Sequence, residues 1–132
     1  MTKNHPIILY IEDNHDNRKL VNRVLSAAGF EVIGVVDGYA GLDYVQSQTP
    51  DLILIDLQLP QLDGYTVTSR LREFNKLRET PIIALTANVL KEDRERSFKA
   101  GCNGFINKPI NVDLLPKQVE SYLSGEFHSL NE

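Results

Sequence analysis

Acidic residues follow two apolar runs of this sequence, and they are the first candidates for chemistry. Asp56 follows the run Leu52–Ile55, and Glu12 and Asp13 follow the run Ile7–Ile11. Such short unbroken apolar runs with β-branched members indicate strands that are buried on both faces. In an open parallel sheet, ligands bind beyond the carboxyl ends of the strands. These acids therefore occupy the positions at which a ligand would bind.

The three acids predict a divalent cation if the two strands are neighbours. Carboxylates that share one cleft repel each other unless some of them are protonated or a cation lies among them. Lys108 follows the last apolar run, but a single ammonium does not balance three anions. Oxygen ligands in an incompletely filled site suit Mg²⁺, which keeps several waters and accepts phosphate oxygens. We therefore expect Mg²⁺ beside Glu12, Asp13 and Asp56.

A metal ion beside a carboxylate nucleophile indicates phosphoryl transfer. Asp56 could attack a phosphoryl group and become an acyl phosphate. The transition state spreads negative charge over three equatorial oxygens, which need cations or hydrogen-bond donors around them. Mg²⁺ and the Lys108 ammonium would meet two of these oxygens. The Thr86 hydroxyl, or a backbone N–H of the Leu57–Gln58 or Ala87–Asn88 turns, would meet the third.

Alternating strand and helix signals position these groups. The expected strands are Ile7–Ile11, Glu31–Val36, Leu52–Ile55, Ile82–Leu85 and Gly104–Ile106. Helical patterns run from the caps Asn14–Asn17 to Gly29, from Asp37–Gly38 to Thr49–Pro50, from Asp63 through Phe74, over Leu90–Ala100 and over Val112–Leu123. Five strand–helix repeats with short connections predict an α/β fold, a parallel five-stranded sheet covered by helices on both faces.

If the strand order is the flavodoxin-like 2-1-3-4-5, the first and third strands are neighbours and bring the three acids together. This is a (βα)5 three-layer sandwich. The fourth and fifth strands would then end at Thr86 and Lys108. The fourth helix has a thin apolar stripe of Val89, Leu90 and Phe98, so we expect it to be among the less firmly held elements. Pro116 fits only the first turn of the last helix and favours a later start.

Size and composition predict one domain with protein or small-molecule partners. The chain has 132 residues, of which 42% are hydrophobic and 24% charged, and its net charge is −4. We expect a single domain over residues 1–132, with a core of about 7–123 and a tail of 124–132. The acidic balance argues against direct nucleic-acid binding. No apolar run reaches the length of a membrane span, and the lone Cys102 suits a reducing, cytoplasmic compartment.

Together, the chemical and turn residues resemble the receiver domain of bacterial two-component response regulators. The resemblance covers about residues 7–123, and the segments Leu59–Gly64 and Gly101–Gly104 look closest to chemotaxis-type, stand-alone or hybrid-kinase receivers. The landmarks that carry it are Glu12–Asp13, Asp56 followed by Pro60 and Asp63–Gly64, Thr86–Ala87, Gly101 and Lys108–Pro109.

The resemblance implies a role for each residue of the site. Asp56 would accept phosphate from a phosphohistidine on a histidine kinase or histidine phosphotransfer protein. Asp13, Asp56 and the Gln58 backbone carbonyl would bind Mg²⁺ directly, and Glu12 would act mainly through water. Lys108 would be the phosphate partner.

The resemblance also implies a switch. Thr86 and Phe105 would be the switch pair, and Pro109 would follow a cis peptide bond that aims Lys108 inward. Phosphorylation would repack the fourth helix, the last strand and the last helix for a downstream protein target. Such a protein is not an enzyme in the usual sense, because it catalyses only its own phosphorylation and dephosphorylation.

Some residues depart from the family pattern, and other functions compete. Phe105 lacks the hydroxyl of the tyrosine often found there, and Gln58 and Asn88 occupy variable positions that affect phosphate lifetime. A receiver fold could instead be a scaffold that works without phosphorylation. A haloacid-dehalogenase-type phosphatase would need a second Asp where this chain has Gln58. An EF-hand beginning at Asp13 lacks the central glycine and the final glutamate.

Overall fold

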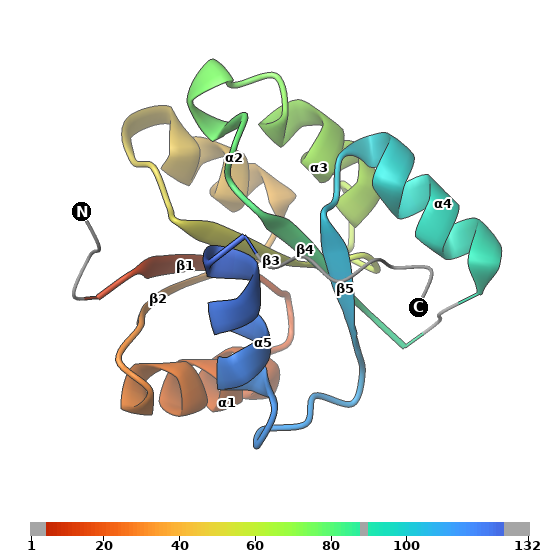
Figure 1. The fold of residues 1–132 in the computed structure, drawn as a ribbon. Helices are drawn as coiled ribbons and strands as arrows, with labels where there is room; N and C mark the ends of the chain where they lie inside the picture. The colour runs from red at the N-terminus through yellow and green to blue at the C-terminus, as the bar shows by residue number, and fades with distance from the viewer. Residues whose placement is uncertain (1–4, 88–89, 126–132) are drawn as a thin grey trace.

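The computed structural model describes residues 5–87 and 90–125, so the expectations for Asn88, Val89 and the tail beyond residue 125 lie outside the described residues. Strands and helices alternate along the chain (Figure 1). The elements are β1 (Ile7–Ile11), α1 (His15–Ala27), β2 (Glu31–Val35), α2 (Gly38–Ser47), β3 (Leu52–Asp56), α3 (Gly64–Leu71), a short 3₁₀ helix (Asn75–Leu77), β4 (Ile82–Thr86), α4 (Lys91–Ala100), β5 (Gly104–Asn107) and α5 (Leu115–Leu123).

The strands form one parallel sheet in the order β2-β1-β3-β4-β5, which confirms the predicted order. Ile11 pairs with Ile55 between β1 and β3. Asp56 pairs with Leu85 between β3 and β4. One edge of the sheet therefore brings together the two acids that follow β1, Asp56 at the end of β3, and the end of β4.

Helices cover both faces of the sheet, α1 and α5 on one face and α2, α3 and α4 on the other (Figure 1). Residues that alternate along β1 belong to opposite faces. Tyr10 packs in one buried cluster with Val21 of α1 and Val119 of α5, whereas Leu9 packs in the other with Val45 of α2. The sandwich thus has two cores, one on each side of the sheet, as the apolar runs predicted.

Several boundaries differ from the predicted ranges by one or a few residues. Strand β2 ends at Val35, and Val36 is 50% exposed. Helix α3 ends at Leu71, so Phe74 lies beyond it in extended backbone before the 3₁₀ helix. Helix α5 begins at Leu115 with Pro116 in its first turn, which agrees with the later start that the proline favoured.

Helix α4 buries little apolar surface, as its thin apolar stripe predicted. Leu90 just before it is 59% exposed and Phe98 is 42% exposed, and among the described side chains of α4 only Ser97 is fully buried. Tyr65 of α3 links α3 to α4: the Arg96 guanidinium lies 4.0 Å from its ring centroid. This cation–π contact contributes to holding α4 against α3.

Arg72 joins the end of α3 to the start of β4 and the end of α4. Its guanidinium donates to the carbonyl oxygens of Leu77 at 2.7 Å, Thr80 at 2.8 Å and Gly101 at 2.9 Å. It also donates to Asn103 Oδ1 at 2.6 Å. A planar fork with several N–H groups can satisfy all these oxygens at once. The C-terminal end of α4 is therefore tied to α3.

Among residues 5–87 and 90–125, no helix has the length and apolar character needed to cross a membrane.

Candidate functional site

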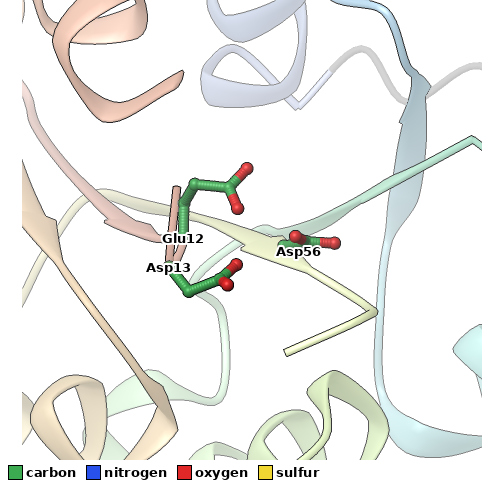
Figure 2. Close-up of side chains that lie close together, drawn as sticks. All are labelled: Glu12, Asp13 and Asp56. Atoms are coloured by element: carbon green, nitrogen blue, oxygen red, sulfur yellow. The ribbon is translucent and has the colours of Figure 1, made fainter. Parts of the chain in front are cut away.

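Three carboxylates meet at the carboxyl edge of the sheet. Glu12 and Asp13 follow β1, Asp56 ends β3, and one oxygen of each lies within 4.8 Å of the others. Figure 2 shows Asp56 across from the pair, with Glu12 and Asp13 pointing in different directions from the end of β1. Glu12 and Asp56 are buried, whereas Asp13 is exposed. The predicted convergence of the three acids is thus present, and one side of the cluster is open to solvent.

Among the described residues, one donor lies against each oxygen of Asp56. The Gln58 backbone N–H donates to Oδ1 at 3.0 Å, and Lys108 Nζ lies 3.0 Å from Oδ2. Burial raises the pKa of Asp56, and the neighbouring Glu12 raises it further, while the donors from Gln58 and Lys108 act against the shift. The nucleophile candidate is therefore a desolvated carboxyl group that depends on nearby cations for its charge.

Glu12 is held by several donors, and its bonds to Tyr10 and Asn17 were not predicted from the sequence. Its Oε1 accepts from Tyr10 Oη at 3.1 Å, Asn17 Nδ2 at 3.3 Å and Lys108 Nζ at 3.1 Å. Its Oε2 accepts from the Asn14 backbone N–H at 3.4 Å. A signal was available, because Tyr10 is a hydroxyl-bearing residue inside an apolar run and lies two positions before Glu12, on the same side of the strand.

Lys108 lies at the centre of the buried charges. It follows β5, its backbone N–H donates to the Thr86 carbonyl at 2.9 Å, and its peptide bond to Pro109 is cis, the geometry that the resemblance implies. Burial favours the neutral amine, but the carboxylates of Asp56 and Glu12 outweigh it and raise the pKa of Lys108. The lysine therefore remains an ammonium between two acids.

The donor set of the cluster fits a hard divalent cation. All three acids offer oxygen, and one ammonium leaves the cluster with an excess of negative charge. The exposed Asp13 leaves room for the waters that Mg²⁺ retains. Gln58, whose carbonyl was predicted as a further ligand, is exposed two residues after Asp56.

The predicted switch residues lie on adjacent strands beside the site. Thr86 is buried at the end of β4, one residue after the partner of Asp56 in the register. Ala84, two residues earlier on β4, pairs with Phe105 of β5, so Thr86 and Phe105 belong to the same face of the sheet. The half-buried Phe105 ring lies 6.5 Å, centroid to centroid, from the ring of Phe98 on α4. Phe105 therefore connects the face of the sheet that carries Thr86 to helix α4.

Asp63 and Gly64 close the loop that follows β3. Asp63, expected as a turn residue and a helix cap, caps α3 by accepting from the Thr66 backbone N–H and hydroxyl, both at 3.0 Å. Partial burial acts to raise the pKa of Asp63, but these hydrogen bonds outweigh it and lower the pKa. A Cβ on Gly64 would lie 2.6 Å from the Asp56 carbonyl oxygen and 2.7 Å from Leu57 Cα. The loop can approach the end of β3 this closely only with glycine at position 64.

Comparison with known proteins gives the same picture. The family model for the response regulator receiver domain matches residues 8–120. The polar-differentiation response regulator DivK of Brucella ovis is 41% identical over 123 residues, which cover 93% of this chain and 98% of DivK. DivK of Brucella anthropi is 40% identical over 116 residues, or 88% of this chain and 94% of that protein.

Solved structures agree with the sequence relatives. The receiver domain of the sensor histidine kinase PA1611 from Pseudomonas aeruginosa, solved with a magnesium ion coordinated in its active-site cleft, has a TM-score of 0.84 and 37% identity, covering 91% of this chain and 98% of that one. The chemotaxis response regulator CheY4 of Vibrio cholerae has a TM-score of 0.85 and 28% identity, covering 88% and 97%. With the acid cluster, the lysine and the fold in agreement, the chain belongs to the response regulator receiver domain family.

Proposed function

We propose that this protein is a cytoplasmic response regulator whose Asp56 accepts a phosphoryl group from a phosphohistidine on a histidine kinase or histidine phosphotransfer protein. The observation that carries the proposal is the position of Lys108 Nζ, 3.0 Å from Asp56 Oδ2 within a cluster of three acids. An isolated acid pair at a strand end is often only a solvated turn. A buried aspartate that is paired with a lysine and lies beside two further acids has the parts that phosphoryl transfer needs.

The reaction balances with the groups of the site. An Asp56 carboxylate oxygen forms the new bond to phosphorus as the bond from phosphorus to the donor imidazole nitrogen breaks, and the electron pair stays on that nitrogen. Lys108 turns from the carboxylate toward an oxygen of the transferred group. Backbone N–H groups after β3 and the Thr86 hydroxyl are the further donors.

The metal ligands in this proposal are Asp13, Asp56 and the Gln58 carbonyl, with Glu12 acting through water. Bound there, Mg²⁺ would supply positive charge to the phosphoryl oxygens. The magnesium ion in the similar PA1611 receiver domain supports this assignment. The cyanobacterial phytochrome response regulator RcpA, 27% identical with a TM-score of 0.79, was solved in a phosphorylated state, which supports the proposed phosphoryl transfer rather than the metal ligands.

Phosphorylation would act on a protein-binding face made by α4, β5 and α5. Thr86 would move toward the phosphoryl group, Phe105 would follow it into the space that Thr86 leaves, and the contact of Phe105 with Phe98 would carry the change to α4. The small buried surface of α4 makes this helix the element that repacks most readily. The readout would be binding of a downstream protein.

A labelling experiment tests the proposal. The wild-type protein should form an acyl phosphate with a small phosphodonor such as acetyl phosphate when Mg²⁺ is present. Asp56→Asn should abolish the label, whereas Asp43→Asn, on the exposed side of α2, should leave it unchanged. Equal labelling of the Asp56→Asn variant would show that the acceptor lies elsewhere. A scaffold would be favoured instead if Asp56→Ala bound the downstream partner as well as the phosphorylated wild type.

A further inference from the structure

The two oxygens of Glu12 have different surroundings. Oε1 lies within hydrogen-bond distance of Tyr10 Oη, Asn17 Nδ2 and Lys108 Nζ. Among the described residues, Oε2 has a single longer contact, to the Asn14 backbone N–H. A carboxylate oxygen offers about two lone-pair sites. Three donors saturate Oε1, so Oε2 is the oxygen that Glu12 can turn toward the metal side of the cluster.

Tyr10 is a rigid donor to this carboxylate. Its side chain is fully buried near the carboxyl end of β1, packed in the cluster formed with α1 and α5. A buried hydroxyl needs a hydrogen-bond partner, and a carboxylate is a strong acceptor. Because residues two apart on a strand share a face, β1 itself directs Tyr10 and Glu12 to the same side of the sheet. The Tyr10 hydroxyl therefore fixes the Glu12 carboxylate from the buried side of the site.

Asn17 holds the same oxygen from α1. Its backbone N–H donates to the Asn14 side chain, which caps the helix, and its side-chain amide donates to Glu12. The cap fixes the backbone of Asn17 at the start of α1. Two elements, β1 and α1, thus hold the Oε1 side of Glu12.

Lys108 is shared between the fixed Glu12 and the nucleophile candidate. Its ammonium lies 3.1 Å from Glu12 Oε1 and 3.0 Å from Asp56 Oδ2. If Glu12 rotated away, the ammonium would rest on Asp56 alone and hold one of its oxygens more tightly. The position of Glu12 therefore controls how strongly the Lys108 ammonium pairs with the Asp56 carboxylate.

We infer that Tyr10 and Asn17 are positioning residues that fix Glu12 Oε1 as the second partner of Lys108 and so keep Asp56 available to the phosphoryl donor. This inference rests on the proposed function of Asp56. It assigns the two oxygens of Glu12 separate tasks, Oε1 for the lysine and Oε2 for the water of the metal ion. Neither Tyr10 nor Asn17 touches the reacting atoms.

Tyr10→Phe and Asn17→Ala test the inference, with Tyr122→Phe as the matched control. Tyr122 belongs to the same core cluster, but its hydroxyl lies against Gly104 at the opposite end of the sheet from Glu12. Losing a hydrogen bond to a charged group should lower the phosphorylation rate at saturating Mg²⁺ about tenfold in Tyr10→Phe. Direct Mg²⁺ titration should show a loss of affinity well below tenfold, because Oε2, the oxygen assigned to the water of the metal ion, keeps its surroundings.

A spectroscopic readout separates positioning from general loss of structure. In protein without phosphodonor or Mg²⁺, the Glu12 carboxyl carbon and Lys108 Nζ NMR resonances should move in Tyr10→Phe and stay in place in Tyr122→Phe. Unchanged Glu12 and Lys108 resonances in Tyr10→Phe would overturn the inference. A rate loss matched by an equal loss of Mg²⁺ affinity would also overturn it.

The same data distinguish failure of the inference from failure of the proposed function. If wild-type protein took no phosphoryl group from the donor, the role of Asp56 would be wrong and the part of the inference that concerns its availability would fall with it. The Glu12 and Lys108 resonances would still decide whether Tyr10 positions those two side chains.

Discussion

Lys108 Nζ lies 3.0 Å from Asp56 Oδ2, so the lysine and the candidate phosphoacceptor are already an ion pair before any phosphoryl group arrives. Asp56 ends β3 and Lys108 follows β5, and these strands are not neighbours because β4 lies between them. Lys108 reaches across the end of β4, where its backbone N–H is bonded to the Thr86 carbonyl. The lysine thus connects the acceptor to the strand that carries the proposed switch residue.

Replacing Lys108 should have opposite effects on phosphorylation and on Mg²⁺ binding. We expect Lys108→Met to slow phosphorylation of Asp56 about a hundredfold, because one donor to the developing charge is lost. The same variant should bind Mg²⁺ more tightly, since no ammonium competes for Asp56. Lys117→Met, at an exposed position on α5, is the control. Unchanged phosphorylation of Lys108→Met, measured by acyl-phosphate labelling, would rule out this role.

Mg²⁺ should stabilise the native protein through the acid cluster. A ligand that binds only the folded state at a hundred times its Kd adds about 2.7 kcal/mol to the free energy of unfolding. Urea unfolding with and without Mg²⁺ measures this increment. The increment should be much smaller in Asp13→Asn, because the substitution weakens the exposed metal ligand of the cluster. In Asp43→Asn, a substitution on α2, the increment should equal that of the wild type. The same increment in Asp13→Asn as in the wild type would contradict the proposed ligand set.

Gly64→Ala should damage both stability and the site. The new Cβ would lie 2.6 Å from the Asp56 carbonyl oxygen, a backbone atom that cannot give way easily. We expect a loss of about 3 kcal/mol in the free energy of unfolding, as for overpacked positions. Gly34→Ala is the control, because the atom nearest to its Cβ would belong to the flexible Arg18 side chain, at 3.4 Å. Equal stability of the two variants in thermal unfolding would be inconsistent with this close contact.

The Cys102 thiol should be unreactive in the folded protein and should make it less stable at alkaline pH. Burial raises the pKa of Cys102 to about 11, against opposing effects of Thr68 and Arg72. A raised pKa in the folded state means that the stability due to this group is complete below the unfolded pKa of 9.0 and falls as pH rises toward 11.

Alkylation of Cys102 at pH 8 should therefore be slow without denaturant and fast with it. Cys102→Ala should show less loss of stability than the wild type between pH 9 and 11, the interval between the two pKa values. Fast labelling of the native wild type would show that the thiol is not buried.

Much of the fold could be predicted because the strongest signals are local. The apolar runs before Glu12 and Asp56 mark buried strands, Asp63 has the residue type and spacing of a helix cap, and Pro116 limits where α5 can begin. The convergence of the acids then follows from one rule, that ligands bind at the carboxyl ends of parallel strands.

Contacts between distant segments could not be predicted in the same way. The bonds of Arg72 to Gly101 and Asn103 depend on how α3 packs against the end of α4, and the helical pattern around Arg72 gives no sign of them. The need for glycine at position 64 depends on how closely the loop returns to Asp56. Tyr10 is a different case, because the sequence shows both its residue type and its spacing from Glu12. Its hydrogen bond to Glu12 becomes evident only in the folded site.

The most direct test of the central claim is the backbone amide NMR spectrum of the protein with Mg²⁺ and beryllofluoride, an analogue of the phosphoryl group. If Asp56 is the acceptor and Thr86 and Phe105 respond to it, amide resonances from Thr86 to Phe105 should shift in the wild type and not in Asp56→Asn. An unchanged wild-type spectrum at saturating analogue, or equal shifts in Asp56→Asn, would contradict the account.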